Sequence, residues 1–224
     1  MKEFLILVFL FLQSALFSQG FQDQNYYYTV DLSKAADDQI LVELIPPKQA
    51  EDIIYFRLPA VIPGSYSIHN FGKFVTKIRA YDEQGKMLSA SKVDGTSWMI
   101  MGATGLAKIE YKIDDTFDDN LSLEKIFEPA GTSFEEGSGF LINTHCIFGY
   151  FDKQLDRVFN VTFIKPVDFY ASTCLNAVTR ESERDVFLAA DYKELMDNPI
   201  LYCLPDTATI TYEDISVLIS VYSK

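Results

Sequence analysis

Short segments of alternating apolar and polar residues are the feature that most constrains how this chain can fold. Ile40, Val42 and Leu44 alternate with residues that include Glu43, and residues 109–114 alternate in the same way. Successive side chains of a β-strand point to opposite faces of a sheet, so this spacing predicts strands with one buried face. Strand-like composition recurs in seven further segments: residues 53–58, 74–82, 157–165, 169–177, 185–189, 207–213 and 215–222.

Turn-forming residues separate these segments and decide the fold class. Residues 82–85, residues 94–95 and residues 180–185 fall between consecutive predicted strands, where hairpin connections are expected. No internal repeat and no linker rich in proline, glycine or serine divides the chain. We therefore predict an all-β fold, an antiparallel β-sandwich-like domain.

Helical patterns are scarce, and the sequence predicts one or two short helices. One is expected within residues 189–199, with Asp191 as its N-cap, because an aspartate side chain can accept hydrogen bonds from the first turn. A second is expected to begin after one of the serines in residues 65–67 and to carry Ile68 and Phe71 inward.

The N-terminus has the composition of a secretory signal peptide. Lys2 precedes an apolar run at residues 4–12, and small and polar residues follow it. The run is shorter than a bilayer-spanning helix requires. We expect residues 1–20 to be a signal peptide and residues 21–224 to be one β domain, exported to the periplasm or the extracellular space and not held in a membrane after cleavage.

Charge and cysteine content limit the partners and the covalent chemistry. The formal net charge is −13, which repels phosphate backbones and anionic lipid and argues against nucleic-acid binding. Three cysteines, Cys146, Cys174 and Cys203, leave at least one thiol unpaired in an oxidising compartment. A bridge between Cys174 and Cys203 is one arrangement, and three buried thiols is the arrangement we favour.

Catalytic motifs are missing from the sequence, and we predict no catalytic and no metal-binding residue in this chain. The two histidines, His69 and His145, lack the i, i+4 partner of a zinc peptidase helix. Cys146 adjoins His145 on what we expect to be a strand, where neighbouring side chains point apart. Residues 137–140 are expected to be a turn into a strand, and the acidic residues 114–120 lack the glycine of an EF-hand loop.

Aromatic residues gather in two places and favour burial over ligand stacking. Three tyrosines stand together at residues 26–28, and Phe148, Tyr150 and Phe151 lie close together in the second half of the chain. We expect them to pack against a neighbouring layer or another domain rather than to form a sugar-stacking platform.

Residues 56–75, FRLPAVIPGSYSIHNFGKFV, carry a resemblance to a known family. They are similar to a turn motif in the N-terminal domain of the glycyl-aminopeptidase family of zinc metallopeptidases (metallopeptidase family 61), with Val61 where the family usually has tryptophan. Residues 28–32, 127–152 and 191–200 agree with the family in the same order. The motif residues of the turn are Pro59, Pro63, Gly64, Ser65 and Tyr66.

The resemblance implies a non-catalytic role for this chain. Members of the family continue from this β domain into a helical, thermolysin-like peptidase domain, which holds zinc on a His-Glu-x-x-His helix. This sequence contains no such helix, so the zinc cofactor is implied for the full-length family and none for this chain. We expect the chain to be a fragment or a truncated reading frame whose partner is the catalytic peptidase domain, in cis or as a separate chain.

Three interpretations of function follow. We favour a domain that packs on the peptidase domain and helps to shape its substrate cleft, with residues 137–150 facing the cleft and Asn143, Phe148 and Tyr150 as candidate cleft-facing residues. The second is a stand-alone secreted β-sandwich binding module for a protein or glycan partner. The third, an independent hydrolase, requires a nucleophile, a base and an orienting group that two histidines and three cysteines do not supply.

Overall fold

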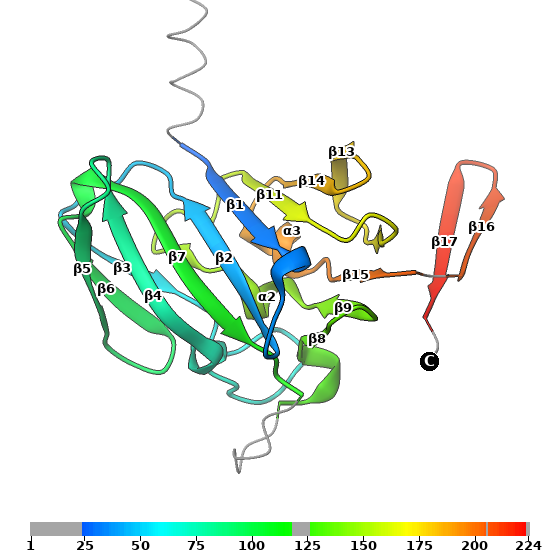
Figure 1. Cartoon of the computed structure of the whole chain (residues 1–224), viewed down its shortest axis with the longest axis horizontal. Helices are drawn as coiled ribbons and strands as arrows, with labels where there is room; N and C mark the ends of the chain where they lie inside the picture. Colours follow the sequence, from blue (N-terminus) through cyan, green and yellow to red (C-terminus); the bar gives the residue numbers. More distant parts are fainter. Residues whose placement is uncertain (1–23, 118–125, 205, 223–224) are drawn as a thin grey trace, which may run out of the picture.

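The computed structural model describes residues 24–117, 126–204 and 206–222, and about half of these residues lie in β-strands. One long sheet forms the body of the molecule, a shorter sheet packs beside it, and a separate hairpin follows (Figure 1). The long sheet has the order β10 (Tyr150–Phe151), β3 (Ile53–Arg57), β6 (Ser97–Met101), β5 (Met87–Lys92), β4 (Val75–Asp82), β7 (Leu106–Asp114), β2 (Gln39–Ile45), β1 (Tyr26–Asp31), β11 (Phe159–Ile164), β14 (Arg184–Ala189) and β13 (Asn176–Arg180).

The shorter sheet and the hairpin complete the strands. The shorter sheet has the order β12 (Tyr170–Ser172), β15 (Ile200–Cys203), β9 (Gly139–Ile142) and β8 (Ser133–Glu135), and the hairpin consists of β16 (Asp206–Tyr212) and β17 (Ile215–Val221). The described helices are short. They are α2 (Thr144–Ile147), α3 (Tyr192–Met196) and four 3-10 turns, η1 (Leu32–Lys34), η2 (Phe71–Phe74), η3 (Ala103–Gly105) and η4 (Glu128–Ala130).

The predicted alternation is present in the central strands. In β2, Ile40, Val42 and Leu44 are fully buried, and in β7 the side chains of Ile109, Tyr111 and Ile113 are fully buried. All neighbouring strand pairs in the described sheets are antiparallel except β1 with β11, which run parallel. Two parallel strands need a long connection between them. Here the chain between β1 and β11 forms most of the other strands of the long sheet.

The layers form because the long sheet curls until distant strands face one another. The ring of Phe56 on β3 lies 5.5 Å from that of Tyr111 on β7, although several strands separate β3 and β7 in the sheet. At the other end of the body, the shorter sheet packs on the long one: the ring of Tyr202 on β15 lies 5.2 Å from that of Phe163 on β11. The prediction of an all-β, antiparallel, sandwich-like domain with one or two short α-helices is confirmed.

Two predictions of local structure need correction. The segment 169–177 is two strands, β12 and β13, which lie in different sheets because the chain turns at residues 173–175. The second helix does not follow the serines at 65–67. It is the 3-10 turn η2, and Ile68 is exposed rather than inward, although Phe71 is buried as expected. Tyr66 and Asn70 both have positive φ, a conformation that interrupts a helix.

The helix within residues 189–199 is present as α3. The Asp191 carboxylate accepts a hydrogen bond from the Glu194 backbone N–H at 2.7 Å, and the Glu194 side chain accepts one from Ala190 N–H at 2.6 Å. Two of the first backbone donors are thereby satisfied, as in a capping box. The helix buries Leu195 and Tyr192 against the body of the domain.

Four tyrosine hydroxyls hold the residues 147–151, which we call the clamped segment. The hydroxyls of Tyr111, Tyr192 and Tyr28 donate to the carbonyls of Ile147, Phe148 and Gly149 at 2.7, 2.9 and 2.7 Å. The Tyr26 hydroxyl accepts from Phe151 N–H at 2.9 Å. Burial raises the pKa of each of these four tyrosines above its usual value, so the three donors keep their protons. The clamped segment therefore crosses the core with its backbone satisfied.

Gly149 is the tightest point of the clamped segment and gives a test of the fold. A Cβ at this position would lie 2.3 Å from Cζ of Phe56 and 2.7 Å from the Arg57 carbonyl oxygen. We expect Gly149→Ala to lower the free energy of unfolding by about 3 kcal/mol, the upper end of the usual overpacking penalty. Denaturant unfolding measures the change. Gly105→Ala is the control, because its Cβ would meet Asp82 only at 3.9 Å, and equal losses in the two variants would contradict the packing.

Candidate functional site

The family-motif turn is a loop whose base is closed by backbone hydrogen bonds. The N–H groups of His69 and Asn70 both donate to the Ala60 carbonyl, at 2.8 and 3.0 Å, and Phe71 N–H donates to the Pro59 carbonyl at 3.1 Å. Residues 59–71, which we call the motif loop, therefore leave the end of β3 and return to nearly the same point. The closed base fixes the direction in which the tip projects.

The tip of the motif loop is ordered by its own residues. Gly64 has a φ of +85°, which glycine adopts at little cost. The Ser65 hydroxyl donates to the Ile62 carbonyl at 3.0 Å, and Ser65 N–H donates to the same carbonyl at 3.3 Å. The motif residues Pro63, Gly64 and Ser65 thus build the turn.

Apolar side chains stand on the outside of this turn. Tyr66 is 98% exposed and Ile68 is 68% exposed, and Val61 is also exposed. Isolated apolar residues on a surface are ordinary, but here three of them belong to one short loop. The structure of the loop therefore presents apolar surface to solvent instead of burying it.

A shallow groove of about 420 Å³ lies at the base of the motif loop. It contains two of the candidate site residues that the sequence singled out, Pro59 and Tyr150, and it brings them to α3. The rings of Tyr150 and Tyr192 lie 4.7 Å apart in a tilted arrangement. The lining is Pro59, Val61, Tyr150, Leu155, Asp156, Asp191, Tyr192, Lys193 and Met196.

The other two candidate cleft residues lie inside the domain. The Asn143 side-chain amide donates to the carbonyls of Pro129, at 3.2 Å, and Gly131. Phe148 is fully buried, with its ring 4.9 Å from that of Tyr28. Tyr150 is half-buried and opens onto the groove. Of the three, only Tyr150 therefore presents a side chain that a second domain could contact here.

His145 and Cys146 lie on the helix α2. The prediction that they lie on a strand is wrong. Both side chains reach the Ala130 carbonyl, His145 Nε2 at 2.9 Å and Cys146 Sγ at 3.3 Å. Burial raises the pKa of the Cys146 thiol well above its usual value, so the thiolate needed for a nucleophile is suppressed. This pair serves the packing of residues 128–130 against α2.

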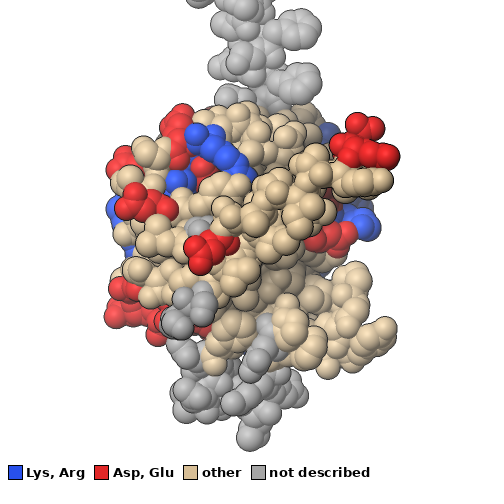
Figure 2. Space-filling view, turned by 90° about the vertical axis from the view of Figure 1, so that its right-hand side faces the viewer, with Lys and Arg blue, Asp and Glu red and all other residues tan. Residues whose placement is uncertain are grey.

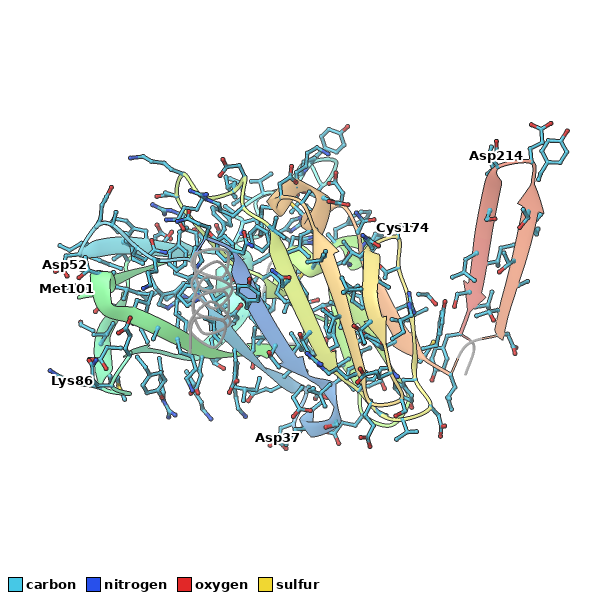
Figure 3. The ribbon with its side chains drawn as sticks, turned by 90° about the horizontal axis from the view of Figure 1, so that it is seen from above. Asp37, Asp52, Lys86, Met101, Cys174 and Asp214 are labelled. Atoms are coloured by element: carbon cyan, nitrogen blue, oxygen red, sulfur yellow. The ribbon has the colours of Figure 1, made fainter. Side chains whose placement is uncertain are left out.

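The burial of the three cysteines differs from the prediction at one position. All three cysteines are free thiols, and Cys146 and Cys203 are buried as expected. Cys174 is exposed at the turn between β12 and β13 (Figure 3), because the chain leaves one sheet for the other at that point.

The two histidines, 76 positions apart in the sequence by their numbers, approach the same phenylalanine. The Phe71 ring lies 5.3 Å from that of His69 and 4.8 Å from that of His145. His69 is buried, and its Nε2 has no hydrogen-bond partner. Burial lowers the pKa of both histidines, and Lys73 lowers that of His69 further.

The described residues do not fit a zinc site. No three side chains of His, Cys, Asp or Glu gather at metal-binding distance in the described ranges, and both histidines pack on the Phe71 ring. The acidic segment 114–120 lies partly outside the described residues. Within its described part, Asp115 accepts from Phe117 and Phe134 N–H at 2.6 Å each. Among helices in the described part of the chain, none is long and apolar enough to cross a membrane.

Comparison with known sequences decides the family. A profile of the Peptidase M61 N-terminal domain matches residues 27–203, which include all of β1 but its first residue, the motif loop, the clamped segment and β15. This chain belongs to the Peptidase M61 N-terminal domain family. The match stops before the hairpin of β16 and β17. No curated protein matches the sequence.

One solved structure shares the fold. An aminopeptidase N family protein from Idiomarina loihiensis is similar over 89% of this chain and 32% of that chain, with a TM-score of 0.76 and 17% identity. This chain thus spans about a third of that protein's length. An M1 zinc metallopeptidase variant from Deinococcus radiodurans, bound to a Tyr-Ser-Ala substrate, aligns over 87% of this chain and 46% of that one, with a TM-score of 0.44 and 10% identity.

Sequence reasoning missed half of the groove. It found Pro59 through the family motif and Tyr150 through the aromatic cluster. Tyr192 and Leu155 were not singled out. Tyr192 N–H donates to the Leu155 carbonyl at 2.9 Å, a contact across 37 positions that no local pattern indicates. The available signal was Tyr192 itself, an aromatic residue in the first turn of the predicted helix.

The buried histidines predict acid-sensitive stability. Their folded pKa values lie below the ordinary value, so the unfolded chain binds protons first as the pH falls below about 6.5. We expect the free energy of unfolding to change little between about pH 8 and 6.5, below the range in which thiols and tyrosines titrate, and to fall between about pH 6.5 and 5, before carboxylates titrate. Denaturant unfolding at several pH values measures this, with His69→Phe expected to flatten the curve. A variant curve as steep as that of the wild type would contradict it.

Proposed function

We propose that this chain is the non-catalytic N-terminal domain of an exported glycyl-aminopeptidase-like zinc metallopeptidase. In this role the domain packs on the peptidase domain and helps to shape its substrate cleft. The observation that carries the proposal is the motif loop, which builds an ordered turn in order to expose Val61, Tyr66 and Ile68. An ordered, exposed apolar tip is typical of a surface that a partner covers.

The groove beside the loop supports docking rather than chemistry. Its nine lining residues include no histidine, cysteine or serine, so the groove does not contain the Ser–His or Cys–His pair of nucleophilic catalysis. The paired rings of Tyr150 and Tyr192 and the apolar residues Leu155 and Met196 suit an inserted apolar side chain. Asp156, Asp191 and Lys193 at its margin would fix the orientation of the inserted group.

The zinc and the reaction belong to the peptidase domain in this proposal. The residues that the structure describes include no ligand set for the metal, and we assign this domain no step of the hydrolysis. Export rests on the composition of residues 1–20. The alternative, a stand-alone secreted binding module for a protein or glycan, would use the same exposed loop without a peptidase.

The experiment captures the native product from source cells with an antibody to residues 27–203 and determines its intact mass and bound partners. We expect a polypeptide with a His-Glu-x-x-His motif, in the same chain or bound to it, together with zinc and hydrolysis of glycyl-p-nitroanilide. Recovery of the mature chain alone, free of any peptidase, would refute the proposal and leave the binding module.

Variants of the motif loop test the docking surface in the same cells. We expect the combination Val61→Ser, Tyr66→Ser and Ile68→Ser to lower the captured aminopeptidase activity about tenfold or more, because central apolar contacts dominate interfaces. The control is Met87→Ser, Met101→Ser and Val178→Ser, which removes three exposed apolar residues elsewhere on the surface. Met101 pairs with Ile53, at the opposite end of β3 from the loop. Equal activity in the two triple variants would show that the loop is not the docking surface.

A further inference from the structure

The hairpin of β16 and β17 lies outside the family's N-terminal domain and apart from both sheets. The family match ends at residue 203, and the hairpin begins at Asp206. In Figures 1 and 3 the hairpin stands clear of the body, with Asp214 at its turn. A two-stranded hairpin is marginally stable in water without a layer to pack on. The structure of this segment therefore calls for a covering partner.

The register of the hairpin sorts its side chains onto two different faces. Residues directly opposite one another in an antiparallel pair point to the same side. Ile210 pairs with Val217, Tyr212 with Ile215, and Ala208 with Ile219. These pairs, with Val221 opposite Asp206, make one face of the hairpin almost entirely apolar, and we call it the apolar ribbon face.

The opposite face is polar and is directed toward the body at one point. Its pairs are Thr207 with Ser220, Thr209 with Leu218, and Thr211 with Ser216. The Ser220 hydroxyl lies 2.6 Å from that of Ser172 on β12, a hydrogen bond between hairpin and body. The domain therefore contacts the hydroxyl-bearing face, and the apolar ribbon face has no cover from the described residues.

The apolar ribbon face is highly exposed. Tyr212 is 73% exposed and Ile215 is 67% exposed, and Ile210, Val217, Ile219 and Val221 are exposed as well. Figure 2, which looks at the molecule from the hairpin side, shows that most of this side carries neither acidic nor basic side chains. Charged side chains are the usual protection of exposed strands against association, and here they are confined to the ends of the hairpin, at Asp206, Glu213 and Asp214.

We propose that the apolar ribbon face docks against an apolar face of the peptidase domain, so that the hairpin is a second, independent contact between the two domains. The inference rests on the proposed function, because it takes its partner from there. A second copy of this chain is the other obvious occupant. Two copies would bring together bodies of net charge −13, whose repulsion opposes association.

The test replaces Val217 on the apolar ribbon face, or Thr209 on the polar face, with the photo-crosslinking residue p-benzoylphenylalanine. Each substitution is encoded in the gene in source cells. After irradiation and antibody capture, mass spectrometry identifies the crosslinked peptides. We expect Val217 to crosslink to the polypeptide region that contains, or is continuous with, the His-Glu-x-x-His motif, and Thr209 to give at least about tenfold fewer such crosslinks.

Each other outcome overturns the inference. Crosslinks from Val217 to the hairpin of a second copy would assign the face to self-association, and equal yields from Val217 and Thr209 would show that the faces are not distinguished. A captured peptidase without Val217 crosslinks would refute the hairpin contact alone. Capture without any peptidase would refute the proposed function, so the two failures are distinguishable.

A second measurement uses the protein without the crosslinking residue, so its result does not depend on whether the probe variants fold. Hydrogen exchange compares the hairpin amides of the isolated mature chain with those of the captured native product. We expect at least about tenfold slower exchange for residues 208–219 in the native product. Unchanged exchange in a product that contains the peptidase would contradict docking.

Discussion

The clamped segment is the constraint on which the rest of the structure depends. Residues 147–151 cross the core between curled layers, and only Tyr150 and Phe151 pair with a strand, β3. A buried carbonyl without a partner costs about 1–3 kcal/mol, and three consecutive carbonyls of this segment are satisfied by tyrosine hydroxyls. Tyr26 and Tyr28 come from β1, Tyr111 from β7 and Tyr192 from α3. The tyrosines of three parts of the chain, which are distant in sequence, thus bind the backbone of the same short segment.

This tie explains why the groove forms where it does. Gly149 lets the segment pass within contact distance of Phe56, on the strand that leads into the motif loop. The next residue, Tyr150, must then emerge beside Pro59, and Tyr192 is held there because its hydroxyl is bound to Phe148. The positions of the motif loop, the groove and α3 therefore depend on one another.

Strands and fold class could be predicted from the sequence because alternation is a local signal. The alternation at Ile40, Val42 and Leu44 translates directly into a buried face. The aromatic cluster at residues 26–28 was correctly expected to pack, but its hydroxyl partners lie more than a hundred positions away, at Gly149 and Phe151. Such partners are set by the curl of the sheet. The helix α2 was missed for the same reason, since its four residues bury every side chain and show no periodicity.

The same physical argument separates the motif loop from the hairpin. In the loop, exposure of Tyr66 and Ile68 is imposed by a closed base and by positive φ at Gly64, so the apolar tip is a consequence of a rigid turn. In the hairpin, exposure follows from register, which places hydroxyl side chains on one face and aliphatic side chains on the other. A one-residue slip would exchange the faces, and the Ser172–Ser220 hydrogen bond favours the observed one. Two unrelated features thus leave apolar surface uncovered on the same chain. A β domain that stood alone in solution would gain nothing from either, whereas a domain that holds a second domain at two points would use both.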